Sequence, residues 1–248
     1  MVPCSSHNNL RRVGSIALAF ALAVACAAQP SKATQDAERD ALFAVTARKA
    51  REAVVLVHPA PGHTGGSGAG FVFTPDGHIL TNAHIVDDMS GIEVIFSDGK
   101  RLPARLVGLV ADKNPDVAVL KVDSDSPFAA LSFGEPPEQG DAVLAIGHPA
   151  MVSFWVPIKG EVVGFGRESV RVDMPSFYGM SGAPLLDLTG SVVGLIFGTR
   201  VPRVESATPG PLQVINSWEE FGRLKPPVSA ATADAVRTAV DRILQAQP

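Results

Sequence analysis

A serine between two glycines is the residue of this chain whose setting most directly suggests chemistry. Residues 179–184 read Gly-Met-Ser-Gly-Ala-Pro, and Ser181 supplies the hydroxyl. Glycine lets the backbone turn sharply and lets a substrate carbonyl come close. The amides of Gly179 and Ser181 could then face the oxyanion of a tetrahedral intermediate. Because a serine hydroxyl is a weak nucleophile alone, this prediction requires a base and an orienting acid elsewhere in the chain.

Both partners occur upstream of the serine. His84 lies in the stretch Leu-Thr-Asn-Ala-His-Ile-Val, and Asp116 opens the apolar stretch that follows it. Other acids compete for the second role. Asp112 precedes a loop, Asp123 follows the strand, and residues 87–88 come just after the histidine. We prefer Asp116 because a strand can fix its carboxylate. The order His, Asp, Ser differs from the order Ser, acid, His of α/β-hydrolases.

The N-terminal residues have the character of an export signal. Two arginines at 11–12 precede an apolar run over 13–25. A membrane-spanning helix needs about 20 apolar residues and a signal-peptide core about 7–15. We therefore predict that residues 1–25 are a signal peptide and that the protein is exported to the periplasm or cell envelope. Cys26 ends a stretch that resembles a lipobox, so lipidation of Cys26, with membrane attachment, and ordinary cleavage after an Ala-x-Ala pattern both stay open.

Composition excludes several function classes. The two cysteines, Cys4 and Cys26, both lie in the leader region, which argues against a disulfide framework. The net charge is −4 and no basic cluster is present, which argues against nucleic acid as a partner. The histidines are scattered without metal-ligand spacing. We expect no metal and no cofactor.

Short apolar stretches alternate with turn signals along most of the chain, which is typical of an all-β sandwich or barrel. A polar, proline-bearing crossing near 123–140 divides the chain into two β-rich halves, with His84 and Asp116 in the first and Ser181 in the second. The strands expected in the first half are 53–57, 70–73, 78–81, 92–96, 102–110 and 117–122. Those expected in the second half are 142–147, 156–165, 169–174, 183–187, 192–197 and 211–215. Helical spacing of apolar residues predicts helices over 36–51 and 230–247.

Five motifs resemble those of the trypsin-like peptidases of the HtrA/Deg type, in that family's order and over roughly residues 40–220. They are residues 66–71, 77–84, 116–122, 145–149 and 179–185. The resemblance implies a chymotrypsin/trypsin-like double β-barrel with short terminal helices. It also implies that His84 is the general base, Asp116 its orienter and Ser181 the nucleophile, with the amides of Gly179 and Ser181 as the oxyanion hole.

Two departures from the family pattern stand out. Met180 and Ala183 replace the Asn and Gly that usually flank the nucleophile. The stretch after residue 215 is too short for the PDZ domain that such proteins typically carry, so we expect none. The expected organisation is a signal peptide over 1–25, a tether over 26–38, a peptidase domain over 39–224 and a C-terminal helical extension over 225–248.

The resemblance also places the substrate pocket. Phe177, Ile196, Phe197 and Gly198 are expected to line it, and because none is acidic we predict preference for a small or medium apolar side chain. The sequence thus favours an exported serine endopeptidase that acts on polypeptide substrates, and the resemblance is compatible with a homo-oligomer. The alternative is a catalytically idle binding or adaptor protein of the cell envelope on the same scaffold.

Overall fold

The computed structural model describes residues 31–151, 153–175, 177–199 and 228–246. The first six strands are β1 (Val54–Pro59), β2 (Gly68–Val72), β3 (His78–Thr81), β4 (Ile92–Phe96), β5 (Arg101–Leu109) and β6 (Ala118–Lys121). The next six are β7 (Ala142–Gly147), β8 (Val156–Phe165), β9 (Ser169–Asp173), β10 (Pro184–Leu186), β11 (Val192–Thr199) and β12 (Val228–Thr232). The helices are α1 (Lys32–Ala50), α2 (Ala83–Val86) and α4 (Ala233–Gln245), with single 3₁₀ turns η1 (Arg51–Ala53) and η2 (Pro149–Met151).

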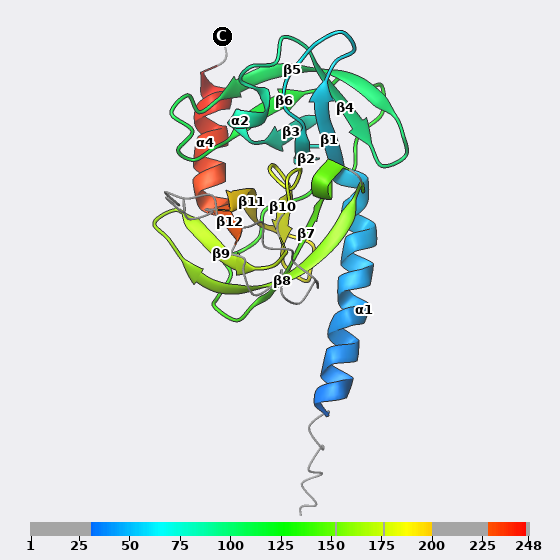
Figure 1. Ribbon diagram of the computed structural model, residues 1–248, viewed down its shortest axis with the longest axis vertical. Helices are drawn as coiled ribbons and strands as arrows, with labels where there is room; N and C mark the ends of the chain where they lie inside the picture. Colours follow the sequence, from blue (N-terminus) through cyan, green and yellow to red (C-terminus); the bar gives the residue numbers. More distant parts are fainter. Residues whose placement is uncertain (1–30, 152, 176, 200–227, 247–248) are drawn as a thin grey trace, which may run out of the picture.

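Within the described residues these strands close into two six-stranded antiparallel barrels, one above the other in Figure 1. The first has the order β1-β2-β3-β6-β5-β4 and the second the order β10-β11-β12-β9-β8-β7. The stretch between β6 and β7 crosses from one barrel to the other. The all-β double barrel expected from the sequence is confirmed.

Local turn chemistry explains two of the hairpins in the first barrel. Gly77, between β2 and β3, has φ +97°, a value that L side chains rarely adopt. Gly99, between β4 and β5, has φ +88°, and the Asp98 carboxylate accepts the Lys100 amide at 2.8 Å. Such aspartate turns fix the reversal of the chain and the register of the strands that follow.

One hydrophobic cluster joins both barrels and both long helices. It contains Phe43 from α1, Phe71 from β2, Leu144 from β7, Leu195 from β11 and Ile243 from α4. Full burial of a side chain of this size contributes about 1.5–3 kcal/mol to the free energy of unfolding. The barrels are therefore packed against each other through this cluster, which holds the residues between them in fixed positions.

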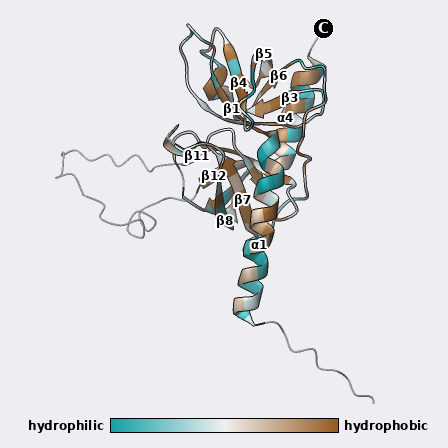
Figure 2. Cartoon of the chain, turned by 90° about the vertical axis from the view of Figure 1, so that its right-hand side faces the viewer, coloured by the Kyte–Doolittle hydropathy of each residue, from teal (hydrophilic) through white to brown (hydrophobic). Residues whose placement is uncertain are grey.

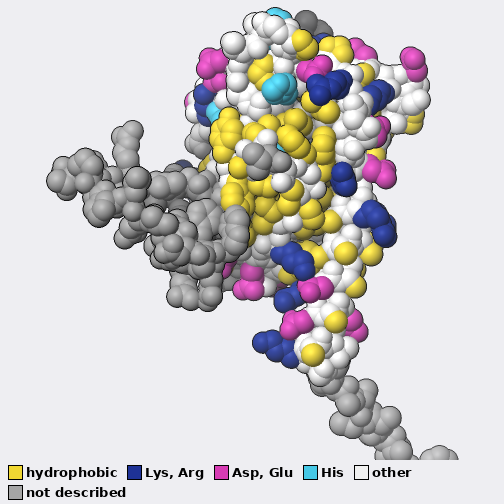
Figure 3. Space-filling model, turned by 45° about the vertical axis from the view of Figure 1, so that its right-hand side comes forward, with side chains coloured by type: hydrophobic (Ala, Val, Ile, Leu, Met, Phe, Trp, Pro, Cys, Tyr) yellow, Lys and Arg dark blue, Asp and Glu magenta, His cyan; other side chains and the backbone are white. Residues whose placement is uncertain are grey.

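The two long helices differ in how they pack. α4 begins after Thr232, whose hydroxyl accepts the Ala235 amide at 3.2 Å, and it buries Val236, Val240 and Ile243 against the barrels. α1 buries few side chains, and its N-terminal half extends past the second barrel in Figure 1. Hydrophilic residues are frequent along α1 in Figure 2, whereas the strands are mostly hydrophobic. Charged side chains of both signs follow its exposed surface in Figure 3.

The structure departs from the expected boundaries at both ends. Residues 32–38, expected in a tether, belong to α1, because Ser31 caps a longer helix by accepting the Thr34 amide. Residues 228–232, expected in the C-terminal extension, form β12, which pairs with β9 and β11 to close the second barrel. The strand expected at 211–215, the expected signal peptide over 1–25 and Cys26 lie outside the described residues. None of the described helices has the length and apolar character needed to span a membrane.

Candidate active site

His84 reaches the surface because the residues around it are fixed in the first barrel. It lies on α2, directly after β3, where its neighbours Ala83, Ile85 and Val86 are all buried. The histidine is therefore the residue of α2 that points outward, and 38 % of its side chain is exposed. Local packing thus presents the imidazole to the region between the barrels.

Asp116 meets His84 through two contacts. One carboxylate oxygen, Oδ2, lies 2.5 Å from the imidazole Nδ1, and the other, Oδ1, accepts the backbone amide of His84 at 3.1 Å. Only 13 % of the Asp116 side chain is exposed. Among the acids that compete for this role in the sequence, Asp116 is the one that the structure pairs with His84. An aspartate in this arrangement holds the proton on Nδ1 and leaves Nε2 unprotonated, ready to accept a proton.

Asn82 was not assigned a role from the sequence, and the structure gives it one. Its side chain is fully buried, and Nδ2 donates to the backbone carbonyl of Asp116 at 2.7 Å. The hydrogen bond ties the end of β3 to the start of β6, so it fixes the segments that carry the histidine and the aspartate. An asparagine directly before a short helix is a common cap, but the Asn82 side chain makes no capping hydrogen bond to α2, so the local sequence carries no signal for its contact with Asp116.

The loop that carries Ser181 is held by both barrels. The Ser181 carbonyl accepts the Ala69 amide of β2 at 2.8 Å, and the Gly182 amide donates to the Ile196 carbonyl of β11 at 2.8 Å. Ser181 also borders the space beside Gly68, whose other wall is Ile85, the residue after His84. The loop therefore lies next to the segment that carries the histidine. The hydrogen bonds of the described residues include none between Ser181 Oγ and His84, and such bonds are often long before substrate is bound.

The amides of Gly179 and Ser181 have no acceptor among the described residues. Tyr178 O accepts the Ala150 amide at 2.7 Å. Because C=O and N–H point in opposite directions across a trans peptide, the Gly179 amide points away from that contact. Among the described residues, neither Gly179 N nor Ser181 N donates a hydrogen bond.

Gly182 illustrates how tightly this loop approaches the first barrel. A Cβ at this position would lie 2.0 Å from the Ala69 carbonyl oxygen, and φ is +82°. Gly62 has nearly the same φ, +83°, but a Cβ added there would have no heavy atom within 4 Å. Comparing an alanine substitution at Gly182 with one at Gly62 therefore separates the cost of backbone strain from the cost of the steric clash.

We therefore expect Gly182→Ala to lower the free energy of unfolding by more than about 3 kcal/mol, because strain and overpacking add. The matched variant Gly62→Ala is expected to cost only about 1–2 kcal/mol. Urea unfolding followed by circular dichroism measures both. Equal losses in the two variants would show that the contact between the Ser181 loop and β2 is not a tight one.

Met180, the departure from the family pattern beside Ser181, is accommodated inside the second barrel. Its side chain is 2 % exposed and belongs to the core cluster of that barrel. It lies against Gly147, where an added Cβ would come within 2.7 Å of the Met180 sulfur. A glycine at the end of β7 thus makes room for the methionine.

The residues expected to line the substrate pocket do not behave alike. Phe197 lines a cavity of about 300 Å³ together with Asp116. The side chain of Ile196 is buried in the second barrel, so only its backbone reaches the serine loop. Phe177 is half-buried against the same core, and Gly198 faces open space.

His148 is a buried histidine whose importance the sequence did not reveal. In the sequence it appears only as the residue after β7. In the structure Nε2 donates to the Val55 carbonyl at 3.1 Å, and Nδ1 accepts the Trp155 amide at 3.3 Å. The Trp155 indole donates to the Val54 carbonyl at 2.8 Å. These bonds tie the segment beside the Gly179 loop to β1 of the other barrel.

Burial lowers the pKa of His148 from its ordinary value of 6.5 to about 4. The folded protein therefore binds this proton less tightly than the unfolded chain does. We therefore expect the contribution of His148 to leave the free energy of unfolding highest above pH 6.5. As the pH drops from 6.5 to 4, this free energy should fall by roughly 3 kcal/mol. Below pH 4 the protonation of His148 should cause no further change. Urea unfolding at pH 7, 5.5 and 4 tests this expectation, with His148→Gln as the comparison. An unchanged pH slope in that variant would assign the effect to other groups.

A protein-family model described as a trypsin-like peptidase domain matches residues 66–195, about half of the chain. The chain belongs to this family. One curated relative, from Rhizobium meliloti, is described as a probable periplasmic serine endoprotease DegP-like. It is 39 % identical to this chain over 137 residues, which make up 52 % of this chain and 27 % of the relative. A protein of the same description from Pseudomonas savastanoi pv. phaseolicola is 40 % identical over 137 residues, 52 % of this chain and 28 % of the relative.

A solved structure supports the fold of the trypsin-like peptidase domain. The crystal structure of the serine endoprotease from Yersinia pestis matches with a TM-score of 0.67 at 24 % identity, over 82 % of this chain and 67 % of that one. At this identity the likeness shows the fold alone. The chain spans little more than a quarter of the length of the curated relatives, to which it is homologous.

Proposed function

We propose that this protein is an exported serine endopeptidase that cleaves polypeptides through an acyl-enzyme intermediate. The observation that carries the proposal is the His84–Asp116 pair, with Nδ1 and Oδ2 2.5 Å apart, beside a loop that presents Ser181. Membership of the trypsin-like peptidase family supports the same reaction. The relatives are named periplasmic, which supports the proposed export.

In the proposed reaction Ser181 Oγ attacks the scissile carbonyl while His84 Nε2 takes its proton and later gives it to the leaving amine. Asp116 keeps the imidazole in the required tautomer and stabilises the imidazolium that forms. The amides of Gly179 and Ser181 stabilise the oxyanion, since they point to no other described acceptor. Water then attacks the acyl-enzyme with His84 again as the base.

Two apolar side chains support an apolar specificity. Phe177 is half-buried against the core of the second barrel and Phe197 lines the cavity beside Asp116, and we propose that the primary pocket takes a small or medium apolar side chain of the substrate. Tyr178, beside the oxyanion loop, is 69 % exposed. An aromatic ring in this position offers contact area to an unfolded chain that lies across the site.

The proposal is tested by incubating the purified protein with reduced, carboxymethylated casein and identifying new peptide termini by mass spectrometry. We expect cleavage after small or medium apolar residues, and none by Ser181→Ala. A profile dominated by basic residues would contradict the specificity. Binding of casein without any new termini would instead support the idle adaptor suggested by the sequence.

A further inference from the structure

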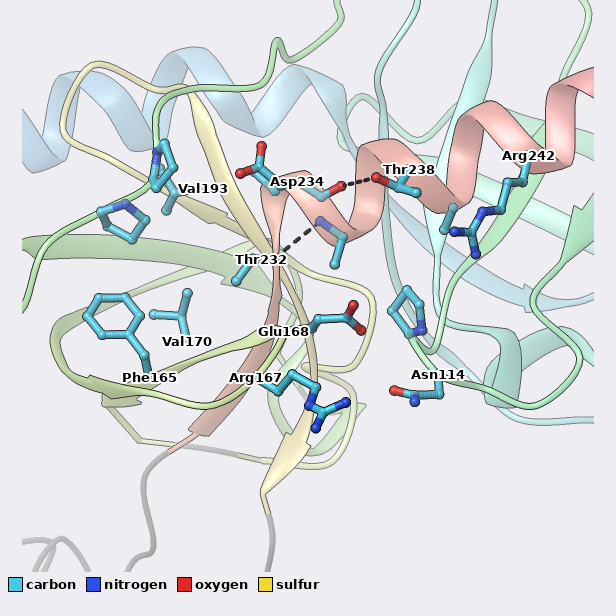
Figure 4. Close-up of a pocket in the computed structure, with 16 residues that line it drawn as sticks. Asn114, Phe165, Arg167, Glu168, Val170, Val193, Thr232, Asp234, Thr238 and Arg242 are labelled. Atoms are coloured by element: carbon cyan, nitrogen blue, oxygen red, sulfur yellow. Dashed lines mark hydrogen bonds between the residues drawn. The ribbon is translucent and has the colours of Figure 1, made fainter.

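A cavity of about 440 Å³ lies beside the start of α4. Figure 4 shows Arg242 and Thr238 on the helix above it and Arg167 and Glu168 on the β8–β9 turn below it. Phe165, at the end of β8, stands at the opposite end from Asn114 and is 45 % exposed. The cavity thus has one apolar end and one polar end.

Some of the charged side chains at the polar end of the cavity form ion pairs and others do not. Asp234 is held by Arg237 at 2.8 Å, so its charge is already paired. Among the described residues, Arg167, Arg242 and Glu168 form no ion pair. Two such guanidinium groups against one such carboxylate give this end of the cavity an excess of positive charge. Guanidinium groups bind carboxylates through paired, charge-assisted hydrogen bonds.

The cavity adjoins the smaller cavity that lies beside Asp116. Asn114, Pro115, Arg167 and Glu168 line it and also line the smaller cavity that contains Asp116 and Phe197. These shared residues lie between the two spaces, so the cavity beside α4 is the neighbour of the one that contains Asp116 and Phe197.

We propose that the two cavities form one extended groove, and that the part beside α4 binds a segment of the substrate several residues from the scissile bond. The segment carries an acidic side chain, which Arg167 and Arg242 bind, next to an apolar side chain, which packs on Phe165. This inference rests on the proposed peptidase function, because the occupant is the substrate itself. It adds a second recognition element to an apolar primary pocket.

The test uses fluorescein-labelled 20-residue peptides with a central Ala-Val and a Glu-Leu pair placed four to eight residues from it on either side. Binding to the Ser181→Ala protein is followed by fluorescence polarisation, so that catalysis is not required. At one or more spacings we expect replacement of Glu by Gln to raise the Kd about tenfold. The double variant Arg167→Ala/Arg242→Ala is expected to bind both peptides with the weaker Kd.

Arg105→Ala is the matched control, because Arg105 lies on β5 and lines neither cavity. In Arg105→Ala the Glu peptide should still bind more tightly than the Gln peptide. This preference should decrease between 50 and 200 mM NaCl, because Arg167 and Arg242 are exposed and salt screens their charges. Equal binding of Glu and Gln peptides at every spacing, or a preference that persists in the double variant, would overturn the inference. Cleavage of the same peptides by the protein with Ser181 intact reports separately on the peptidase function.

Discussion

Ser181→Ala is expected to lower kcat on a casein substrate by about 10⁶-fold. The hydroxyl is the proposed nucleophile, and no other described group stands at the same place beside the Gly179 and Ser181 amides. Adding His84→Ala to this variant should cause little further loss, because the members of a catalytic triad act as a unit. Initial rates measured by release of labelled peptides provide the comparison.

The fold should survive this substitution, since Ser181 is bound to its neighbours through backbone atoms. We therefore expect an unchanged melting temperature. Ser124→Ala, which alters an exposed serine that accepts a hydrogen bond from Lys100 at 3.3 Å, is the matched control and should retain full activity. Substantial activity in Ser181→Ala would show that another group is the nucleophile.

Asp116→Asn is expected to lower kcat by about 10⁴-fold while the structure stays intact. The asparagine oxygen would accept the His84 backbone amide, as Asp116 Oδ1 does at 3.1 Å. Its NH₂ group would then face Nδ1 and force the imidazole proton onto Nε2. In that tautomer His84 has no lone pair available to take the proton of Ser181.

The control for this variant is Asp112→Asn. Asp112 was one of the competing acids in the sequence, and among the described residues its carboxylate accepts only the nearby Asn114 amide, at 3.2 Å. We expect its kcat to change less than twofold, because it touches neither His84 nor Ser181. Comparable losses in the two variants would indicate a general electrostatic effect rather than control of the tautomer.

Much of the barrel fold could be predicted because its strands and turns are encoded locally. Asp98 and Gly99 mark a reversal whatever surrounds them, and the alternation in β4 places its apolar face without knowledge of the partner strand. The His84–Asp116 pair could be predicted for a related reason. A carboxylate that opens a buried strand has few conformations left to it, and the structure pairs that carboxylate with His84.

Features that depend on distant contacts could not be predicted. β12 reads Val-Ser-Ala-Ala-Thr, and its small residues look like the beginning of the helix that follows. Only its pairing with β9 and β11 makes it a strand. His148 gave no local signal either, since its burial depends on β1, more than ninety positions earlier in the chain. The cavity beside α4 likewise combines segments from both barrels.

The proposed activation of Ser181 by His84 is tested most directly by the reaction of the purified protein with a fluorophosphonate, followed by mass spectrometry. These reagents modify a serine only when a base activates it. We expect one adduct, mapped to Ser181, which is absent from Ser181→Ala and forms much more slowly in His84→Ala and Asp116→Asn. A folded sample that forms no adduct, or forms it on another residue, would contradict the assignment of Ser181 and His84 as an activated pair.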